Sequence, residues 1–155
     1  MKNSIRLISG ILCESSAVDQ GTQHLSVFKV LEQIKLDLVS NDPTKTAGSE
    51  GKINIPFNFE IISLWKRQST ADLGRDVQTD VEIDLVDPNG DVLQNVNIEV
   101  RLPATSLRSR YILKVQGIGV TTSGEYSVRF REVDKKGNHS DVLASLPFDI
   151  VVDKR

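Results

Sequence analysis

The chain has 155 residues, of which 26% are charged and 39% hydrophobic, and its formal net charge is −2. This length fits one domain that can bury a core, so we expect a single domain over 1–155. The charge balance gives no broad basic field, which argues against nucleic-acid binding, and no apolar run approaches the roughly 18 residues of a membrane span, so we expect no membrane partner.

The first segment, 5–13, is rich in leucine and β-branched residues and is interpreted as a strand, followed by a polar turn over 14–23. Arg6 interrupts its apolar run, which is not typical of a secretory signal. The single cysteine, Cys13, cannot form an internal disulfide, so the sequence predicts a cytoplasmic protein. We interpret Cys13 as a small buried residue because no histidine lies near it in the sequence.

The next segment, 25–38, has an ambiguous apolar pattern. Several of its apolar residues recur at helical spacing, whereas Leu36 and Leu38 alternate with polar residues as in a strand. We favour a strand to about Leu31, a short break and a second strand. A helix within 28–38 is the alternative.

A polar loop over 41–51 precedes a long alternating strand that starts at 53–61. Pro56 has no N–H to donate, so it indicates an edge position or a bulge. The strand continues to Trp65, the only tryptophan, which we expect to pack in the core beneath a tyrosine corner. A second polar loop covers 69–79.

After an alternating strand at 81–85 comes the sequence Asp-Pro-Asn-Gly, residues 87–90. Pro88 presets φ for a turn, Gly90 can adopt a positive φ, and Asp87 can cap the turn with its side chain. The sequence therefore predicts a hairpin turn here.

The same stretch resembles the start of a calcium loop, in which Asp87, Asn89 and Asp91 would supply oxygen ligands. An EF-hand loop also needs glycine at its sixth position and glutamate at its twelfth, where this chain has Val92 and Ile98. We keep the three residues as weak metal candidates and expect no cofactor.

Further strands and turns follow in the second half of the chain. Strands are expected at 92–102, 111–115 and 146–152, a bulge or turn at 117–119, and a hairpin turn at 135–138. Between them a turn containing Gly124 leads into a strand that alternates Tyr126, Val128 and Phe130 with polar residues. A tyrosine two residues after the turn glycine is where immunoglobulin-like sandwiches place their tyrosine corner.

About eight short strands separated by turn signals are typical of a sandwich or barrel. We therefore predict an all-β fold, an immunoglobulin-like antiparallel β-sandwich of about seven to nine strands. Trp65, Gly124 and Tyr126 are the residues expected to define it.

The second half of the chain is locally basic, with Arg101, Arg108, Arg110, Lys114, Arg129 and Arg131. If their strands are neighbours, Arg129 and Arg131 would line up with Lys114 as an anion-binding face. Acidic residues are interleaved at matching spacing, namely Glu99, Glu125 and Glu132. We therefore favour a solvated face with cross-strand ion pairs.

Four motifs together resemble a family of short bacterial proteins of unknown function: ILCE at 11–14, LSVF at 25–28, LVDPNG at 85–90 and TSGEY at 122–126. Glu14 and Asn89 stand where that family more often has aspartate. The resemblance implies an immunoglobulin-like sandwich and no known chemistry, so it assigns no functional residues.

The sequence contains no serine elbow, phosphate loop or HExxH motif, and His24 and His139 lie in polar loops outside any Cys/His cluster. We therefore expect a non-enzymatic module that binds a protein partner or itself through a sheet face or an edge strand. The alternative is a small-ligand, carbohydrate or calcium-binding domain that uses loops 69–79 and 87–91. A third hypothesis is an enzyme that uses Cys13 or His139.

Overall fold

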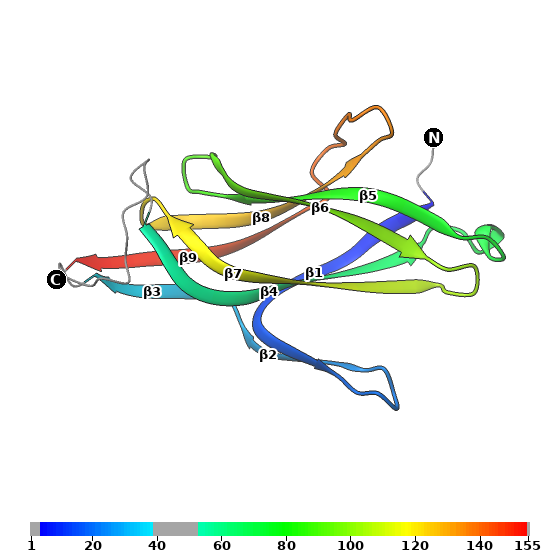
Figure 1. Ribbon diagram of the computed structural model, residues 1–155, viewed down its shortest axis with the longest axis horizontal. Helices are drawn as coiled ribbons and strands as arrows, with labels where there is room; N and C mark the ends of the chain where they lie inside the picture. The colour runs from blue at the N-terminus through cyan, green and yellow to red at the C-terminus, as the bar shows by residue number, and fades with distance from the viewer. Residues whose placement is uncertain (1–3, 39–52, 155) are drawn as a thin grey trace.

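The computed structural model describes residues 4–38 and 53–154, and most of them lie in strands (Figure 1). The described strands are β1 (Ile5–Val18), β2 (Leu25–Val30), β3 (Gln33–Leu38), β4 (Ile53–Arg67), β5 (Val77–Val86), β6 (Val92–Leu102), β7 (Arg108–Val120), β8 (Gly124–Val133) and β9 (Ala144–Lys154). A short 3₁₀ helix, η1, covers Thr70–Asp72. In the described part of the chain, no helix has the length and apolar character needed to cross a membrane.

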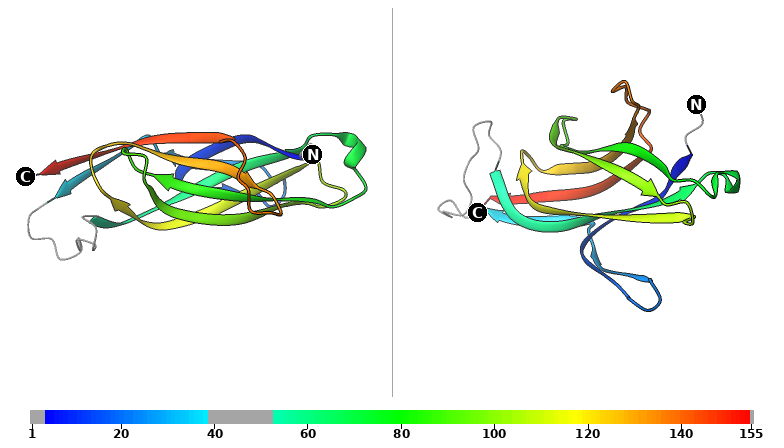
Figure 2. Two further views of the ribbon diagram at one scale, coloured as in Figure 1. Left: turned by 90° about the horizontal axis from the view of Figure 1, so that it is seen from above. Right: turned by 45° about the vertical axis from the view of Figure 1, so that its right-hand side comes forward.

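The strands form two sheets that pack face to face, which confirms the predicted β-sandwich (Figures 1 and 2). The first sheet has the order β2-β1-β4-β7 and the second has the order β3-β9-β8-β5-β6. Neighbouring strands are antiparallel, as expected, apart from the parallel pair β3 and β9.

The segment with the ambiguous apolar pattern forms two strands in different sheets, so the expected strand, break and strand are confirmed. The Leu31 N–H donates to the Leu12 carbonyl in the first sheet, and the Glu32 carbonyl accepts from the Asp149 N–H in the second. The chain therefore changes sheets between two consecutive residues. Ile34 then points into the core with 5% exposure.

β1 is longer than expected, and the predicted polar turn over 14–23 is wrong in its first half. Residues 15–18 pair with β2, so backbone pairing rather than side-chain polarity extends the strand. The turn begins at Asp19, whose carboxylate accepts from the Gly21 and Thr22 N–H groups. The resulting β1–β2 hairpin extends away from the two packed layers (Figure 2).

Pro56 lies at a bulge in a central strand, which confirms one of its two predicted settings. The register between β4 and β7 shifts between Ile55 and Asn58. On the opposing strand Gly117 has a φ of +78°, and an added Cβ would lie 3.3 Å from the Ile55 carbonyl oxygen. Gly117 and Gly119 therefore mark a bulge inside β7, and the strand continues beyond this bulge to Val120.

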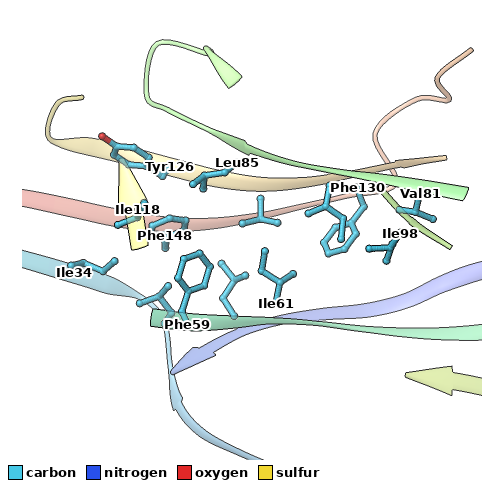
Figure 3. Close-up of a cluster of buried hydrophobic side chains, with 14 of the residues drawn as sticks. Ile34, Phe59, Ile61, Val81, Leu85, Ile98, Ile118, Tyr126, Phe130 and Phe148 are labelled. Carbon is cyan, nitrogen blue, oxygen red and sulfur yellow. The ribbon is translucent and has the colours of Figure 1, made fainter. Parts of the chain in front are cut away.

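The core lies between the sheets and contains aromatic residues from both (Figure 3). The Tyr126 ring stacks on Phe148 with centroids 5.8 Å apart, and Phe148 lies 6.2 Å from Phe59 across the sandwich. Trp65 is also buried, and its indole donates to the Ser63 hydroxyl at 2.8 Å. The prediction that Trp65 lies beneath Tyr126 is wrong. Phe59 is the β4 residue nearest to the Tyr126–Phe148 pair among these aromatic contacts, and Trp65 follows Phe59 by six residues, about 20 Å along an extended strand.

The expected loop over 41–51 lies outside the described residues. The loop expected over 69–79 is shorter, because β5 already begins at Val77. It contains η1 and is held by the Gly74 N–H, which donates to the Ala104 carbonyl, and by Asp76, which accepts from the Ala104 N–H.

Candidate functional site

A groove of about 570 Å³ lies where the chain changes sheets, between β1 and β2 on one side and β8 and β9 on the other. Its walls are mainly apolar side chains. It is lined by Gly10, Ile11, Leu12, Val27, Val30, Leu31, Glu32, Glu125, Leu146, Pro147, Phe148 and Asp149. Such a concave apolar surface with a few polar groups is the usual setting of a binding site.

The groove exists because β9 is only partly covered at its outer edge. β3 pairs with β9 from Asp149 onward, so residues 144–148 have no described strand on that side. Gly10 of β1 closes the base, where an added Cβ would lie 2.7 Å from a Leu146 methyl carbon. The glycine thus lets the two sheets approach closely just below the opening.

The apolar surface continues from the groove onto β2, which is an edge strand of the first sheet. Val30 lines the groove and is 61% exposed, and Phe28 on the same strand is 50% exposed. Large apolar side chains on an unpaired edge are unfavourable in a free surface and often mark a place where a partner docks.

Three exposed carboxylates lie on the walls of the same groove, from Glu32, Glu125 and Asp149. Glu125 and Asp149 are direct cross-strand partners, next to the inward-facing pair Tyr126 and Phe148. Glu32 is joined to the same place by the hydrogen bond from the Asp149 N–H to its carbonyl. Within the described chain, none of the three carboxylates has an ion-pair or hydrogen-bond partner.

Pro147 lies on the exposed edge of β9 and limits how that edge can be used. The Asp149 N–H points toward β3, so the backbone of residue 147 faces the same edge two residues earlier. Proline has no N–H there, which prevents regular strand pairing. The edge of β2 is therefore the better place for an added strand beside this groove.

A second polar cluster covers the outer face of the second sheet. Glu82 of β5 contacts the His139 imidazole at 2.6 Å and the Arg131 guanidinium at 3.1 Å. Arg131 also pairs with Asp84 at 2.7 Å, and Asp84 accepts from the Asn95 amide. The cluster is internally paired, so its charges largely satisfy one another.

The condition for the alternative anion-binding face is not met, because Arg129 and Arg131 lie in β8 of the second sheet and Lys114 lies in β7 of the first. The expectation of cross-strand ion pairs holds for Arg131, whose partners are Glu82 and Asp84 of β5, but not for Arg101, which contacts Glu99 of its own strand β6 at 2.9 Å. It is wrong for Glu132, whose side chain is buried.

The Asp-Pro-Asn-Gly turn is confirmed, and its first carboxylate serves the turn itself. Asp87 accepts from the Asn89 and Asp91 N–H groups at 2.9 Å and from the Thr121 hydroxyl at 2.9 Å. Burial alone would raise the Asp87 pKa, but these hydrogen bonds together lower it. Gly90 has the expected positive φ, +89°.

Of the weak metal candidates Asp87, Asn89 and Asp91, the Asp87 carboxylate is therefore already engaged in hydrogen bonds that hold the turn. Among the residues that the structure describes, no group of three His, Cys, Asp or Glu residues could hold a metal ion. Loops 69–79 and 87–91 lie at opposite ends of β5, whose ten residues span about 30 Å. They do not combine into one site.

Cys13 is fully buried, as expected. Burial, followed by the charge of the neighbouring Glu60, raises the pKa of its thiol. Glu60 itself accepts from the Ser16 hydroxyl at 2.8 Å. A protonated, inaccessible thiol is a poor nucleophile. His24 and His139 are both exposed, and the described contact of the His139 imidazole is with Glu82.

Sequence reasoning missed the groove and its carboxylates. The sequence indicates Glu125 only as a possible ion-pair partner, and no motif links it to Glu32 or Asp149. A local signal for the exposed apolar surface is that Phe28 and Val30 alternate with the polar residue Lys29, close to Ser26.

The comparisons with known proteins show that no protein-family model and no curated protein matches the chain. Among solved structures, the chain is similar to "Northeast Structural Genomics Consortium target SoR45", with 12% identity, a TM-score of 0.41, and coverage of 94% of this chain and 86% of that chain. It is also similar to the N-terminal domain of PorA, with 8% identity, a TM-score of 0.28, and coverage of 93% and 97% respectively. Both scores lie below 0.5, so neither similarity assigns a role to the groove.

Proposed function

We propose that the protein is a non-enzymatic interaction module that binds an extended apolar segment of a protein partner in the groove between β2 and β9. The observation that carries this proposal is the apolar groove of about 570 Å³ that continues onto the exposed Val30 of the edge strand β2. A partner strand added to β2 would gain backbone hydrogen bonds and place alternate side chains in the groove.

We also infer an immunoglobulin-like architecture. The run β1-β4-β7 corresponds to strands A, B and E of that fold, and β9-β8-β5-β6 corresponds to G, F, C and C′. Tyr126 then stands near the start of strand F. Its hydroxyl donates to the Thr122 carbonyl at 2.7 Å, which is the bond of a tyrosine corner.

The residues of the groove support binding better than catalysis. Among the described residues that line it, the charged groups are three carboxylates, and there is no histidine, cysteine or serine that would act as a nucleophile. Burying its apolar walls against a partner would contribute binding energy at about 25 cal/mol per Å² removed from water.

The test is a selection from a displayed library of random peptides, followed by affinity measurements on variants. We expect enriched peptides with apolar side chains whose affinity falls about tenfold for Val30→Ser, because two buried methyl groups are lost. Val92→Ser is the matched control, since Val92 is 51% exposed on β6, outside the groove. We expect it to leave the affinity unchanged.

The proposal is wrong if the selection enriches no peptide, or if Val30→Ser and Val92→Ser affect binding equally. Selective binding of small apolar molecules, with no peptide enriched, would instead indicate a small-molecule pocket, since the groove volume also suits such ligands.

A further inference from the structure

The carboxylates of the groove indicate what kind of segment it receives. We propose that the bound segment carries lysine or arginine beside its apolar anchor, so that these cations meet Glu32, Glu125 and Asp149. This inference rests on the proposed function and specifies the partner of the same site.

The three carboxylates of the groove lie close enough together to repel one another. Glu125 and Asp149 are directly opposite each other on neighbouring strands, on the same face. Like charges in that position destabilise a sheet. Glu32 brings a third negative charge to the same groove. A cation from a partner would neutralise part of this negative charge. The relief of the repulsion between the carboxylates would then add to the binding free energy.

Many other acidic side chains of this protein have an ion-pair or hydrogen-bond partner. Glu82 and Asp84 are paired with Arg131, Glu99 with Arg101, and Glu14 with Lys29 at 3.3 Å. Asp19, Asp87 and Asp134 hold hairpin turns through backbone hydrogen bonds. The carboxylates of the groove have no such partner within the described chain, which is also true of Asp80 and Asp141, but only the former three gather in one groove.

The spacing of the carboxylates in the groove suits cationic side chains better than a metal ion. Within the described residues no cluster of acidic side chains is tight enough to hold a metal ion. Carboxylates that are spread along a groove suit separate cationic side chains on an extended chain better than one metal ion. Protection of the β9 edge from aggregation does not require these charges, because Pro147 already prevents strand pairing there.

The experiment uses an apolar-anchored peptide from the selection, synthesised in two forms that differ only beside the anchor. One form has lysine at the flanking positions and the other has glutamate. We expect the lysine form to bind the wild-type protein at least tenfold more tightly at low salt, and this ratio to shrink as the salt concentration rises.

Charge reversal in the protein supplies the second arm. The double variant Glu125→Lys and Asp149→Lys should invert the preference, so that the glutamate form binds more tightly. The matched control is Asp80→Lys with Asp141→Lys, which changes the net charge equally at two exposed residues that do not line the groove. We expect the control to keep the preference for lysine.

The outcomes separate the two proposals. If both peptide forms bind alike and still depend on Val30, the charge inference is overturned and the interaction module stands. If the control variant inverts the preference as well, the effect is one of net charge, and the inference is also overturned. If neither form binds in a Val30-dependent way, both proposals fail.

Discussion

Tyr126 holds the loop before β8 against the core through its ring and its hydroxyl. The ring is fully buried and stacks on Phe148. The hydroxyl accepts from the Thr121 and Thr122 N–H groups at 3.1 and 3.2 Å and donates to the Thr122 carbonyl. One side chain therefore satisfies three backbone groups of a loop that connects the two sheets.

Replacing Tyr126 with phenylalanine should keep the ring packing and remove these hydrogen bonds. We expect the free energy of unfolding to fall by about 1–3 kcal/mol, because part-buried backbone groups lose their partner. Denaturant unfolding of the variant measures it.

Tyr111→Phe is the control for Tyr126→Phe. The Tyr111 hydroxyl has no hydrogen-bond partner within the part of the chain that the structure describes, so its removal should change stability by less than about 0.5 kcal/mol. Equal effects of the two substitutions would show that the hydroxyl of Tyr126 does not hold the loop.

At the scale of elements, the β5–β6 turn is packed against the start of β8. Gly124 opens β8 with a φ of +146°, and an added Cβ would lie 2.9 Å from Cγ of Pro88 in that turn. Asp87 of the same turn accepts from the Thr121 hydroxyl. The turn that joins β5 to β6 therefore also fixes where β8 begins.

Gly124→Ala should destabilise the protein by about 2 kcal/mol or more, because it combines an unfavourable φ with a steric clash. Gly137→Ala is the matched control. Gly137 also has a positive φ, +83°, but an added Cβ would meet nothing within 4 Å. We expect the control to cost about 1 kcal/mol.

A double variant tests the contact on which the Gly124 prediction depends. Adding Pro88→Ala removes the Pro88 Cγ atom, so the double variant should recover part of the stability lost in Gly124→Ala. Simple additivity of the two changes in thermal or denaturant unfolding would contradict the steric explanation.

Most strands could be predicted from the sequence because alternation is a local property. Tyr126, Val128 and Phe130 alternate with polar residues and are all fully buried, as expected. The exact extent of β1 could not be predicted, because its last residues are held by pairing with β2. The turn from Asp87 to Gly90 was predictable, since its chemistry also lies within a few residues.

At the scale of the whole molecule, local residue patterns do not reveal which strands become neighbours. The basic residues of β7 and β8 would have formed one face only if their strands were neighbours, but the two strands belong to different sheets. Glu125 and Asp149 meet only through the register of β8 and β9, and Glu32 joins them through the parallel β3. The candidate site is thus a product of long-range pairing, which residue patterns do not show.

The acid sensitivity of the whole fold is also set by groups from distant parts of the chain. Hydrogen bonds from the Thr22 and Asn138 N–H groups lower the pKa of Asp19 and Asp134 respectively. Each lowered pKa stabilises the folded state above the unfolded value of about 4 and loses that contribution as the pH falls through the folded pKa. Glu132 opposes them, because burial raises its pKa.

The Glu132 carboxylate therefore destabilises the folded protein when it is charged. Its cost is absent below the unfolded pKa of about 4.3, grows as the pH rises through the raised folded pKa, and is complete above it. Glu132→Gln should accordingly be more stable than the wild type at neutral pH, and the difference should vanish near about pH 4. Asp87→Asn should behave in the opposite way, with a loss of stability at neutral pH that closes in acid, since the Asp87 pKa is lowered. Denaturant unfolding across this pH range measures both, and a Glu132→Gln difference that is independent of pH would show that the carboxylate is not the titrating group.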